Sequence, residues 1–288
     1  MLAPIKHEDN IAFFETTPSS SDDGITYLLL HGIGTSLQFW TAIAPVLGIT
    51  ARTIALDLPG FGDSPLPPNG FRLDHVADQI RIFMKDIDVT NTVLVAHSLG
   101  AFVAFKVAAA EPSRIRRLII VDGTLGRVVN LLKRPWLAFR DPSLALHLAT
   151  YLTESSIPLP ASLAEVVNHS LLIRTIALKP YVADPKDVDS RLVSGAVTHR
   201  GNLVSLQSML RVHEIDYPAL LSAIPQPVDL VVGDKDPLIN EADFQQAISL
   251  VNVRRTLRIT ECGHWPMIEH PTILASFIKA WNTDGASD

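Results

Sequence analysis

Three side chains in the sequence have the types and the order that nucleophilic acyl transfer needs. Ser98 stands at the centre of Ala96-His-Ser-Leu-Gly100, Asp236 ends Gly233-Asp-Lys-Asp, and His264 follows a glycine further along the chain. A serine hydroxyl becomes a strong nucleophile only when a histidine takes its proton and a carboxylate orients that histidine. Serine, acid and histidine in this order predict a catalytic triad of Ser98, Asp236 and His264.

Each member of this predicted triad follows a short apolar run typical of a buried strand. The runs are Thr92–Ala96 before the serine, Val228–Val232 before the acid and Leu257–Ile259 before the histidine. Because open α/β sheets bind ligands beyond the carboxyl ends of their strands, we expect the three side chains to meet there. The serine also precedes an apolar helical stretch, Leu99–Ala110, and a strand-to-helix turn of this kind holds a serine outward. Capping of that helix by the serine hydroxyl is a competing role that the sequence leaves open.

The end of a second predicted strand carries backbone N–H groups that could stabilise the negative charge on the carbonyl oxygen of an attacked substrate. The run Leu30-His-Gly-Ile-Gly34 follows the predicted strand Ile25–Leu30, and its glycines let backbone N–H groups turn toward a ligand. We expect the N–H groups of Ile33 and of Leu99, the residue after the serine, to form a two-donor oxyanion hole.

The remaining pattern predicts one sheet with a long helical insertion. Strands without polar alternation that are separated by helices indicate a parallel sheet covered on both faces. A helical segment at 124–222 is expected to interrupt a core made of residues 1–123 and 223–288. The further elements expected are strands at Ile11–Glu15, Thr53–Leu56 and Leu118–Val121, helices at Leu73–Ile87 and from Pro271 to Trp281, and helical stripes at Leu144–Leu152, Leu163–Ile176 and Leu203–Leu210.

Together these motifs resemble the α/β-hydrolase fold superfamily over nearly all of residues 10–282. The resemblance is to the branch of lidded serine esterases, haloperoxidase-like enzymes and C–C hydrolases, and the loop Asp-Leu-Pro-Gly-Phe-Gly-Asp-Ser at 57–64 supports it. It implies a mostly parallel eight-stranded sheet with helices on both faces and a helical cap between strands six and seven, where segment 124–222 lies. It also implies that Ser98 attacks a carbonyl carbon, that His264 moves the proton and that Asp236 stabilises the imidazolium.

Other residues near the predicted triad compete for the same roles. Asp234 is expected to be a loop or capping residue. Asp122 follows the sixth strand, where some similar proteins carry the acid, and is expected here to cap the turn at Gly123. His97 neighbours the serine and cannot easily fold back onto it, so we expect it to pack beneath the sheet end, while His31 supports the oxyanion loop.

Large apolar side chains are the candidates for a substrate pocket. A helical cap suggests a shielded, apolar pocket for a medium-sized substrate. Tyr151 and Tyr181 of the inserted segment are further candidates, and packing within the cap is the competing role for all of its aromatic residues. The residues expected to contact substrate are Trp136, Phe139, Trp265 and Met267.

Composition excludes several classes of function. The 288-residue chain has a formal net charge of -6 and no basic run, so it offers no electrostatic attraction for nucleic acid or an anionic membrane. One cysteine, Cys262, allows no intrachain disulfide, and the scattered histidines form no metal-binding pattern, so neither a metal nor another cofactor is expected. No apolar run approaches the roughly 18 residues of a membrane span, and the first ten residues do not resemble a signal peptide. We therefore expect a cytoplasmic protein with a small-molecule substrate, and the oligomeric state cannot be read from the sequence.

The chemistry expected of this site is hydrolysis of a carboxylic ester, a thioester or a lactone. A serine at position 98 excludes the haloalkane dehalogenases and epoxide hydrolases among similar proteins, because these carry aspartate there. C–C bond hydrolysis is less favoured, since His97 stands where those hydrolases usually have asparagine. The sequence also leaves open a lyase that uses the triad for proton transfer and a small-molecule receptor on the same fold.

Overall fold

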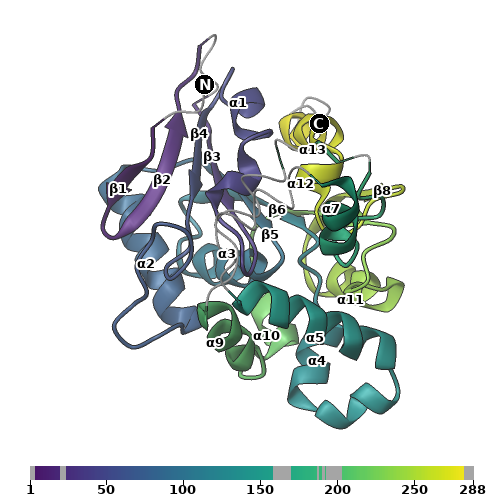
Figure 1. Ribbon diagram of the computed structural model, residues 1–288. Helices are drawn as coiled ribbons and strands as arrows, with labels where there is room; N and C mark the ends of the chain where they lie inside the picture. Colours follow the sequence, from purple (N-terminus) through teal and green to yellow (C-terminus); the bar gives the residue numbers. More distant parts are fainter. Residues whose placement is uncertain are drawn as a thin grey trace.

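A single sheet runs through the centre of the structure, a computed structural model that describes residues 4–19, 24–157, 170–186, 188–189, 192 and 203–281 (Figure 1). Its strands are β1 (Lys6–Glu8), β2 (Ile11–Thr16), β3 (Thr26–Leu30), β4 (Arg52–Leu56), β5 (Thr92–His97), β6 (Ile115–Val121), β7 (Val228–Gly233) and β8 (Val253–Ile259). They lie in the order β1-β2-β4-β3-β5-β6-β7-β8. The pairs β1–β2 and β2–β4 are antiparallel and all other neighbours are parallel. The predicted eight-stranded, mostly parallel sheet is confirmed.

The central strands are apolar on both faces because helices cover both faces. β3, β5 and β7 are buried along their whole length. Leu28 of β3, for example, lies in register between Ile54 of β4 and Leu94 of β5. The edge strand β8 instead alternates between half-buried and exposed residues, as expected for a strand with one face in water.

Two groups of helices cover the sheet. α2 packs on α3, α3 on α10 and α10 on α11, while α1 contacts α13 (Figure 1). α3 is buried almost all round, whereas α2 buries one stripe that includes Val76, Ile80 and Phe83. No helix in the described part of the chain is long and apolar enough to cross a membrane. The helices outside the β6–β7 connection are η1 (Leu37–Trp40), α1 (Ala44–Leu47), α2 (Leu73–Asp86), α3 (Leu99–Ala110), α11 (Glu241–Leu250), α12 (Pro266–Glu269) and α13 (Pro271–Lys279).

The connection between β6 and β7 holds a run of helices, and its described residues contain no strand. α5 and α4 both contact α9 within this connection. Part of the expected stripe Leu163–Ile176, residues 163–169, lies outside the described residues, and a helix begins at Leu171. The helices are α4 (Gly126–Lys133), η2 (Pro135–Phe139), α5 (Pro142–Ser156), α7 (Leu171–Leu178), α9 (Leu203–Val212) and α10 (Tyr217–Ser222).

Strands β6 and β8 are longer than the apolar runs Leu118–Val121 and Leu257–Ile259 that predicted them, because each strand also includes charged residues. Asp229 of β7 is fully buried and forms ion pairs with Arg117 of β6 and with Arg255 of β8, the latter at 2.6 Å. The carboxylate therefore pairs with both arginines and links three neighbouring strands. The short edge strand β1 was not expected, because its three residues are polar and exposed.

Candidate active site

Ser98 sits on a strained turn between β5 and α3. Its backbone has φ 52° and ψ −120°, a conformation that is costly for a residue with a side chain. The Ser98 N–H donates to the Val121 carbonyl of β6 over 3.1 Å, which holds the turn against the sheet. A Cβ at Gly100 would lie 2.5 Å from the His31 carbonyl oxygen, so only glycine lets the helix and the strand end approach this closely. The Ser98 hydroxyl makes no capping bond to α3, so a helix-capping role for this serine is wrong.

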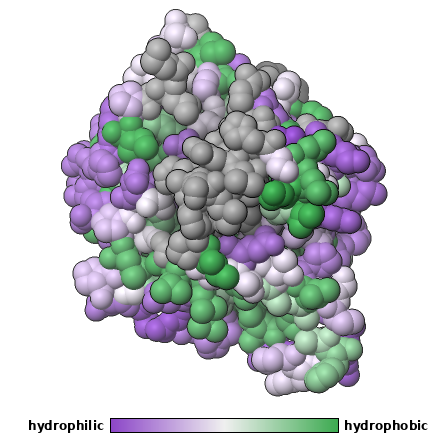
Figure 2. Space-filling model, in the orientation of Figure 1, coloured by the Kyte–Doolittle hydropathy of each residue, from purple (hydrophilic) through white to green (hydrophobic). Residues whose placement is uncertain are grey.

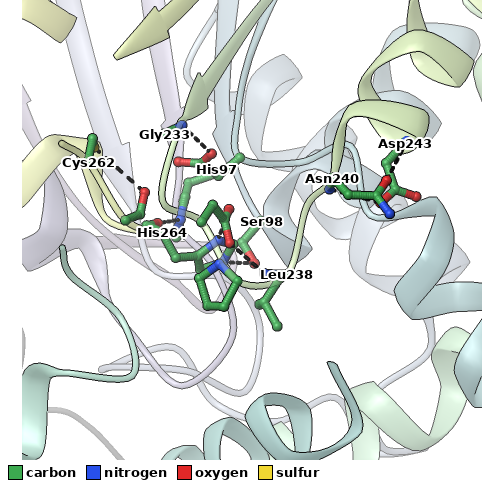
Figure 3. A network of polar contacts seen from close by, with 12 residues as sticks. His97, Ser98, Gly233, Leu238, Asn240, Asp243, Cys262 and His264 are labelled. Carbon is green, nitrogen blue, oxygen red and sulfur yellow. Dashed lines mark hydrogen bonds and ion pairs between the residues drawn. The ribbon is translucent and has the colours of Figure 1, made fainter. Parts of the chain in front are cut away.

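The Ser98 hydroxyl faces His264 instead. Ser98 Oγ lies 3.0 Å from His264 Nε2, and His264 Nδ1 lies 2.7 Å from Asp236 Oδ2 (Figure 3). An ionised carboxylate only accepts, so the proton of His264 sits on Nδ1 and its Nε2 accepts from the Ser98 hydroxyl. The three residues thus lie together with the hydrogen-bond directions that removal of the serine proton requires.

Backbone hydrogen bonds fix the histidine and the acid. The His264 N–H donates to the Tyr181 carbonyl over 2.7 Å, and the His264 carbonyl accepts from His97 Nε2–H over 2.8 Å. Asp236 Oδ1 accepts from the Leu238 N–H over 2.8 Å, which leaves Oδ2 for the imidazole. Since all three predicted triad side chains are buried, water competes little for these contacts.

Two other buried histidines are neutral. Desolvation lowers the pKa of His31 to about 4. His31 Nε2 accepts from the Leu58 N–H over 2.9 Å, and its Nδ1–H donates to the Gly32 carbonyl over 2.7 Å, so it supports the loop expected to hold the oxyanion. Desolvation, with the neighbouring His264, also lowers the pKa of His97 well below its usual value. His97 donates its only proton to the His264 carbonyl and is not placed as a base.

Ile33, Leu99 and Ser98 share the wall of one cavity. Neither the Ile33 N–H nor the Leu99 N–H donates to any acceptor in the part of the chain that the structure describes. Gly34 has φ 65°, a left-handed conformation open to glycine, and it turns the chain just after Ile33. Two backbone donors beside a serine, without protein acceptors, match the requirement for stabilising an oxyanion.

The cavity beside Ser98 is apolar and nearly closed. Its volume is about 10 Å³, measured as the space open to the centre of a water molecule, and such a space holds roughly one water. Helices of the β6–β7 connection form part of its wall, and the Tyr151 ring lies edge-on to His264 with centroids 5.7 Å apart. The described residues that line it are Ile33, Ser98, Leu99, Phe102, Leu125, Val128, Leu148, Tyr151, Met209, Val212 and Leu238.

The four residues predicted to contact substrate are not among those lining residues. Trp136 and Phe139 of η2 are 62% and 91% exposed. The face of the molecule drawn in Figure 2 shows hydrophobic residues among hydrophilic ones at the surface. Trp265 and Met267 are buried, and Trp265 stacks on Tyr181 with centroids 4.5 Å apart. A hydrophobic residue type does not by itself show whether the side chain faces the cavity, the protein interior or solvent. The better signal was the helical spacing of residues 148 and 151 on α5.

Two further acids lie near Asp236. Asp234 is exposed, and its Oδ1 accepts from the Cys262 N–H over 3.4 Å, as expected of a loop residue. Asp122 is fully buried, and its Oδ1 accepts from the Gly233 N–H over 3.0 Å. Atoms of Asp122, Asp236 and His264 lie within 4.8 Å of one another, the one such group of possible metal ligands among the described residues. The expected capping role of Asp122 at the turn of Gly123 is wrong, since its Oδ1 accepts from the Gly233 N–H instead. The sequence pattern does not reveal its proximity to Asp236, because residues 122 and 236 meet only once β6 and β7 have paired.

Comparison with known proteins places the chain in a family. The alpha/beta hydrolase fold family model matches residues 28–271. The chain is 28% identical over 266 residues to the pimeloyl-(acyl-carrier protein) methyl ester esterase of Aromatoleum aromaticum, a match that covers 88% of this chain and 96% of that protein. It is 31% identical over 129 residues to the dihydrolipoyllysine-residue acetyltransferase component of the acetoin cleaving system of Pseudomonas putida, where the match covers 44% of this chain and only 35% of that protein.

Among solved structures, E-2-(acetamidomethylene)succinate hydrolase superposes with a TM-score of 0.73 at 17% identity, over 96% of this chain and 98% of that chain. At this identity the likeness concerns the fold alone. The strand order, the helical connection after β6 and the family match agree with one another. The chain is therefore an enzyme of the alpha/beta hydrolase fold family.

Proposed function

We propose that the protein is a serine hydrolase that cleaves a carboxylic ester, a thioester or a lactone of a medium-sized apolar substrate. The observation that carries this proposal is the hydrogen-bonded series Ser98 Oγ, His264 Nε2, His264 Nδ1 and Asp236 Oδ2, with distances of 3.0 and 2.7 Å. The series ends at an apolar cavity, so an acyl group entering that cavity meets the serine. Similarity to an esterase over nearly the whole chain supports the same choice.

The proposed reaction has two half-reactions. Ser98 Oγ forms a bond to the carbonyl carbon as its proton passes to His264 Nε2, and the imidazolium then gives that proton to the leaving oxygen or sulfur. Water deprotonated by His264 cleaves the resulting acyl-serine ester, which returns the serine and releases the acid. Asp236 stays ionised and stabilises the imidazolium, while the Ile33 and Leu99 N–H groups stabilise the oxyanion.

Residues 124–222 act in this proposal as a cap on a core made of residues 1–123 and 223–288. Leu148 and Tyr151 of α5 and Met209 of α9 line the same cavity as the serine. A cap that contributes apolar side chains excludes water from the reacting centre, which strengthens the electrostatic contacts there. No metal or other cofactor takes part in the proposed steps.

The test is hydrolysis of p-nitrophenyl esters of increasing acyl length by the wild type and by Ser98→Ala. We expect measurable turnover with an optimum of chain length, and a loss on the order of 10⁶ in the variant. Ser113→Ala, which changes an exposed serine outside the cavity, is the matched control and is expected to keep wild-type activity. A fluorophosphonate should label Ser98, located by peptide mass spectrometry.

Different results would favour a different function. Labelling of Ser98 without hydrolysis of any ester would point to a C–C hydrolase or a lyase that uses the same triad. A folded protein that neither hydrolyses esters nor reacts with the fluorophosphonate would be a small-molecule receptor on this fold. Equal hydrolysis by wild type and Ser98→Ala would exclude the proposed nucleophile.

A further inference from the structure

Asp122 is the buried titratable group beside the site for which the proposed reaction has no role. It follows β6 with φ 45°, a left-handed conformation that is uncommon for aspartate, and its side chain is fully buried. Oδ1 accepts from the Gly233 N–H over 3.0 Å, whereas Oδ2 has no hydrogen-bond partner among the described residues. A buried carboxylate oxygen without a partner is costly, so Oδ2 requires an explanation.

The surroundings of Asp122 are acidic. Asp236 faces it from the loop after β7, and Glu269 approaches from α12, while His264 and the thiol of Cys262 lie on the loop after β8. No lysine or arginine in the described part of the chain forms an ion pair with Asp122. A negative charge on Asp236 this close disfavours ionisation of the Asp122 carboxyl group.

The hydrogen bonds distinguish the two acids. Asp236 accepts from two donors, His264 Nδ1–H at 2.7 Å and the Leu238 N–H at 2.8 Å. Asp122 accepts from one donor only. Burial and the charge of Asp236 together raise the pKa of Asp122 well above its usual value. Two facing carboxyl groups offer only lone pairs to each other until one is protonated, and the proton then joins them.

We propose that Asp122 is a neutral carboxylic acid at neutral pH and that its Oδ2–H donates to Asp236, which it positions for His264. The inference rests on the proposed function for its catalytic consequence, because Asp236 matters to the rate only if His264 is the base. Asp122 is then a positioning residue: it adds a third donor to the carboxylate without adding a second negative charge.

The first test compares Asp122→Asn with Asp122→Ala. Asparagine reproduces the neutral acid, because its Oδ1 can accept from Gly233 and its amide can donate to Asp236. We expect Asp122→Asn to keep kcat/KM within a few-fold of wild type. Asp122→Ala removes a hydrogen bond to a charged group and should lower kcat/KM about 10- to 100-fold. The acid limb of its pH profile should move to higher pH, whereas that of Asp122→Asn should not.

The comparison variant is Asp236→Asn, for which we expect a loss on the order of 10⁴ in kcat. If Asp122→Asn remains folded and loses as much, Asp122 is an ionised acid of the triad and the proposal is wrong. If Asp122→Ala fails to fold, as thermal unfolding would reveal, the asparagine variant still decides between a neutral and an ionised residue.

A second test does not depend on activity. Difference infrared spectroscopy of the resting protein should show the C=O band of a protonated carboxyl group that is absent from Asp122→Asn. Glu269→Gln identifies any band of the other buried acid nearby. A spectrum in which Asp122→Asn removes no such band would overturn the inference. Failure of the serine hydrolase proposal, seen as an unlabelled Ser98, would leave this measurement intact.

Discussion

His31 Nε2 accepts a hydrogen bond from the Leu58 N–H, and a proton on that nitrogen would replace the acceptor with a second donor. Its pKa is about 4 in the folded protein, against about 6.5 in an unfolded chain. The unfolded state therefore binds the proton more tightly, and the stability that neutral His31 contributes is complete above about pH 6.5 and lost as the pH falls through 4. The difference corresponds to about 3 kcal/mol.

We expect His31→Gln to reduce the dependence of the unfolding free energy on pH between about 4 and 6.5, because glutamine can accept from Leu58 and does not titrate. Urea denaturation across this pH range measures the effect. Some dependence should remain, since His97 also has a lowered pKa. His7→Gln, at an exposed histidine of β1, is the control. A slope identical to that of wild type in His31→Gln would contradict the explanation.

Among the elements, the short helix α12 joins the loop of His264 to the connection that follows β6. Glu269 Oε1 accepts from the Gly263 N–H over 2.8 Å, and Oε2 accepts from the Ala183 N–H over 2.7 Å. Residue 183 follows closely after Tyr181, whose carbonyl accepts from the His264 N–H. The Glu269 carboxylate thus joins the loop that carries His264 to the segment whose Tyr181 carbonyl accepts from the His264 N–H.

We expect Glu269→Ala to lower kcat by about 10-fold and the free energy of unfolding by about 1–3 kcal/mol, because the N–H groups of Gly263 and Ala183 lose their acceptor. Steady-state kinetics and urea denaturation of the same preparations provide both values. Glu261→Ala, at an exposed acid of the same loop, should change neither. A stable Glu269→Ala variant with unchanged kcat would show that the histidine is held without α12.

The arrangement of strands and helices explains which parts of the fold and of the candidate site could be predicted from the sequence. The apolar runs of β3, β5 and β7 revealed the strands because burial on both faces permits no polar residue there. The order of Ser98, Asp236 and His264 predicted a candidate site, and the strand ends bring these three side chains together. The pocket could not be predicted in the same way: α5 buries Leu148 and exposes 67% of Leu146, and only the packed structure decides which face lies inward.

Across the whole molecule, the core and the β6–β7 connection form the cavity together, so its size depends on side chains from both. We expect Leu148→Ala to move the optimum of p-nitrophenyl esters toward longer acyl chains, because it removes atoms from the wall of the cavity beside the serine. The truncation should also cost about 2–5 kcal/mol of stability. Leu146→Ala, on the exposed face of the same helix, should leave both the optimum and the stability unchanged. An unaltered optimum in Leu148→Ala would place the acyl group elsewhere.

A space that holds roughly one water beside Ser98 has a kinetic consequence. In the proposed reaction, an acyl group larger than this space would bind only the population of molecules in which the wall has moved. The apparent affinity is then the intrinsic affinity reduced by the fraction of molecules in that population. Substitutions that loosen the packing of α5 and α9 are then expected to tighten apparent binding without touching a substrate contact.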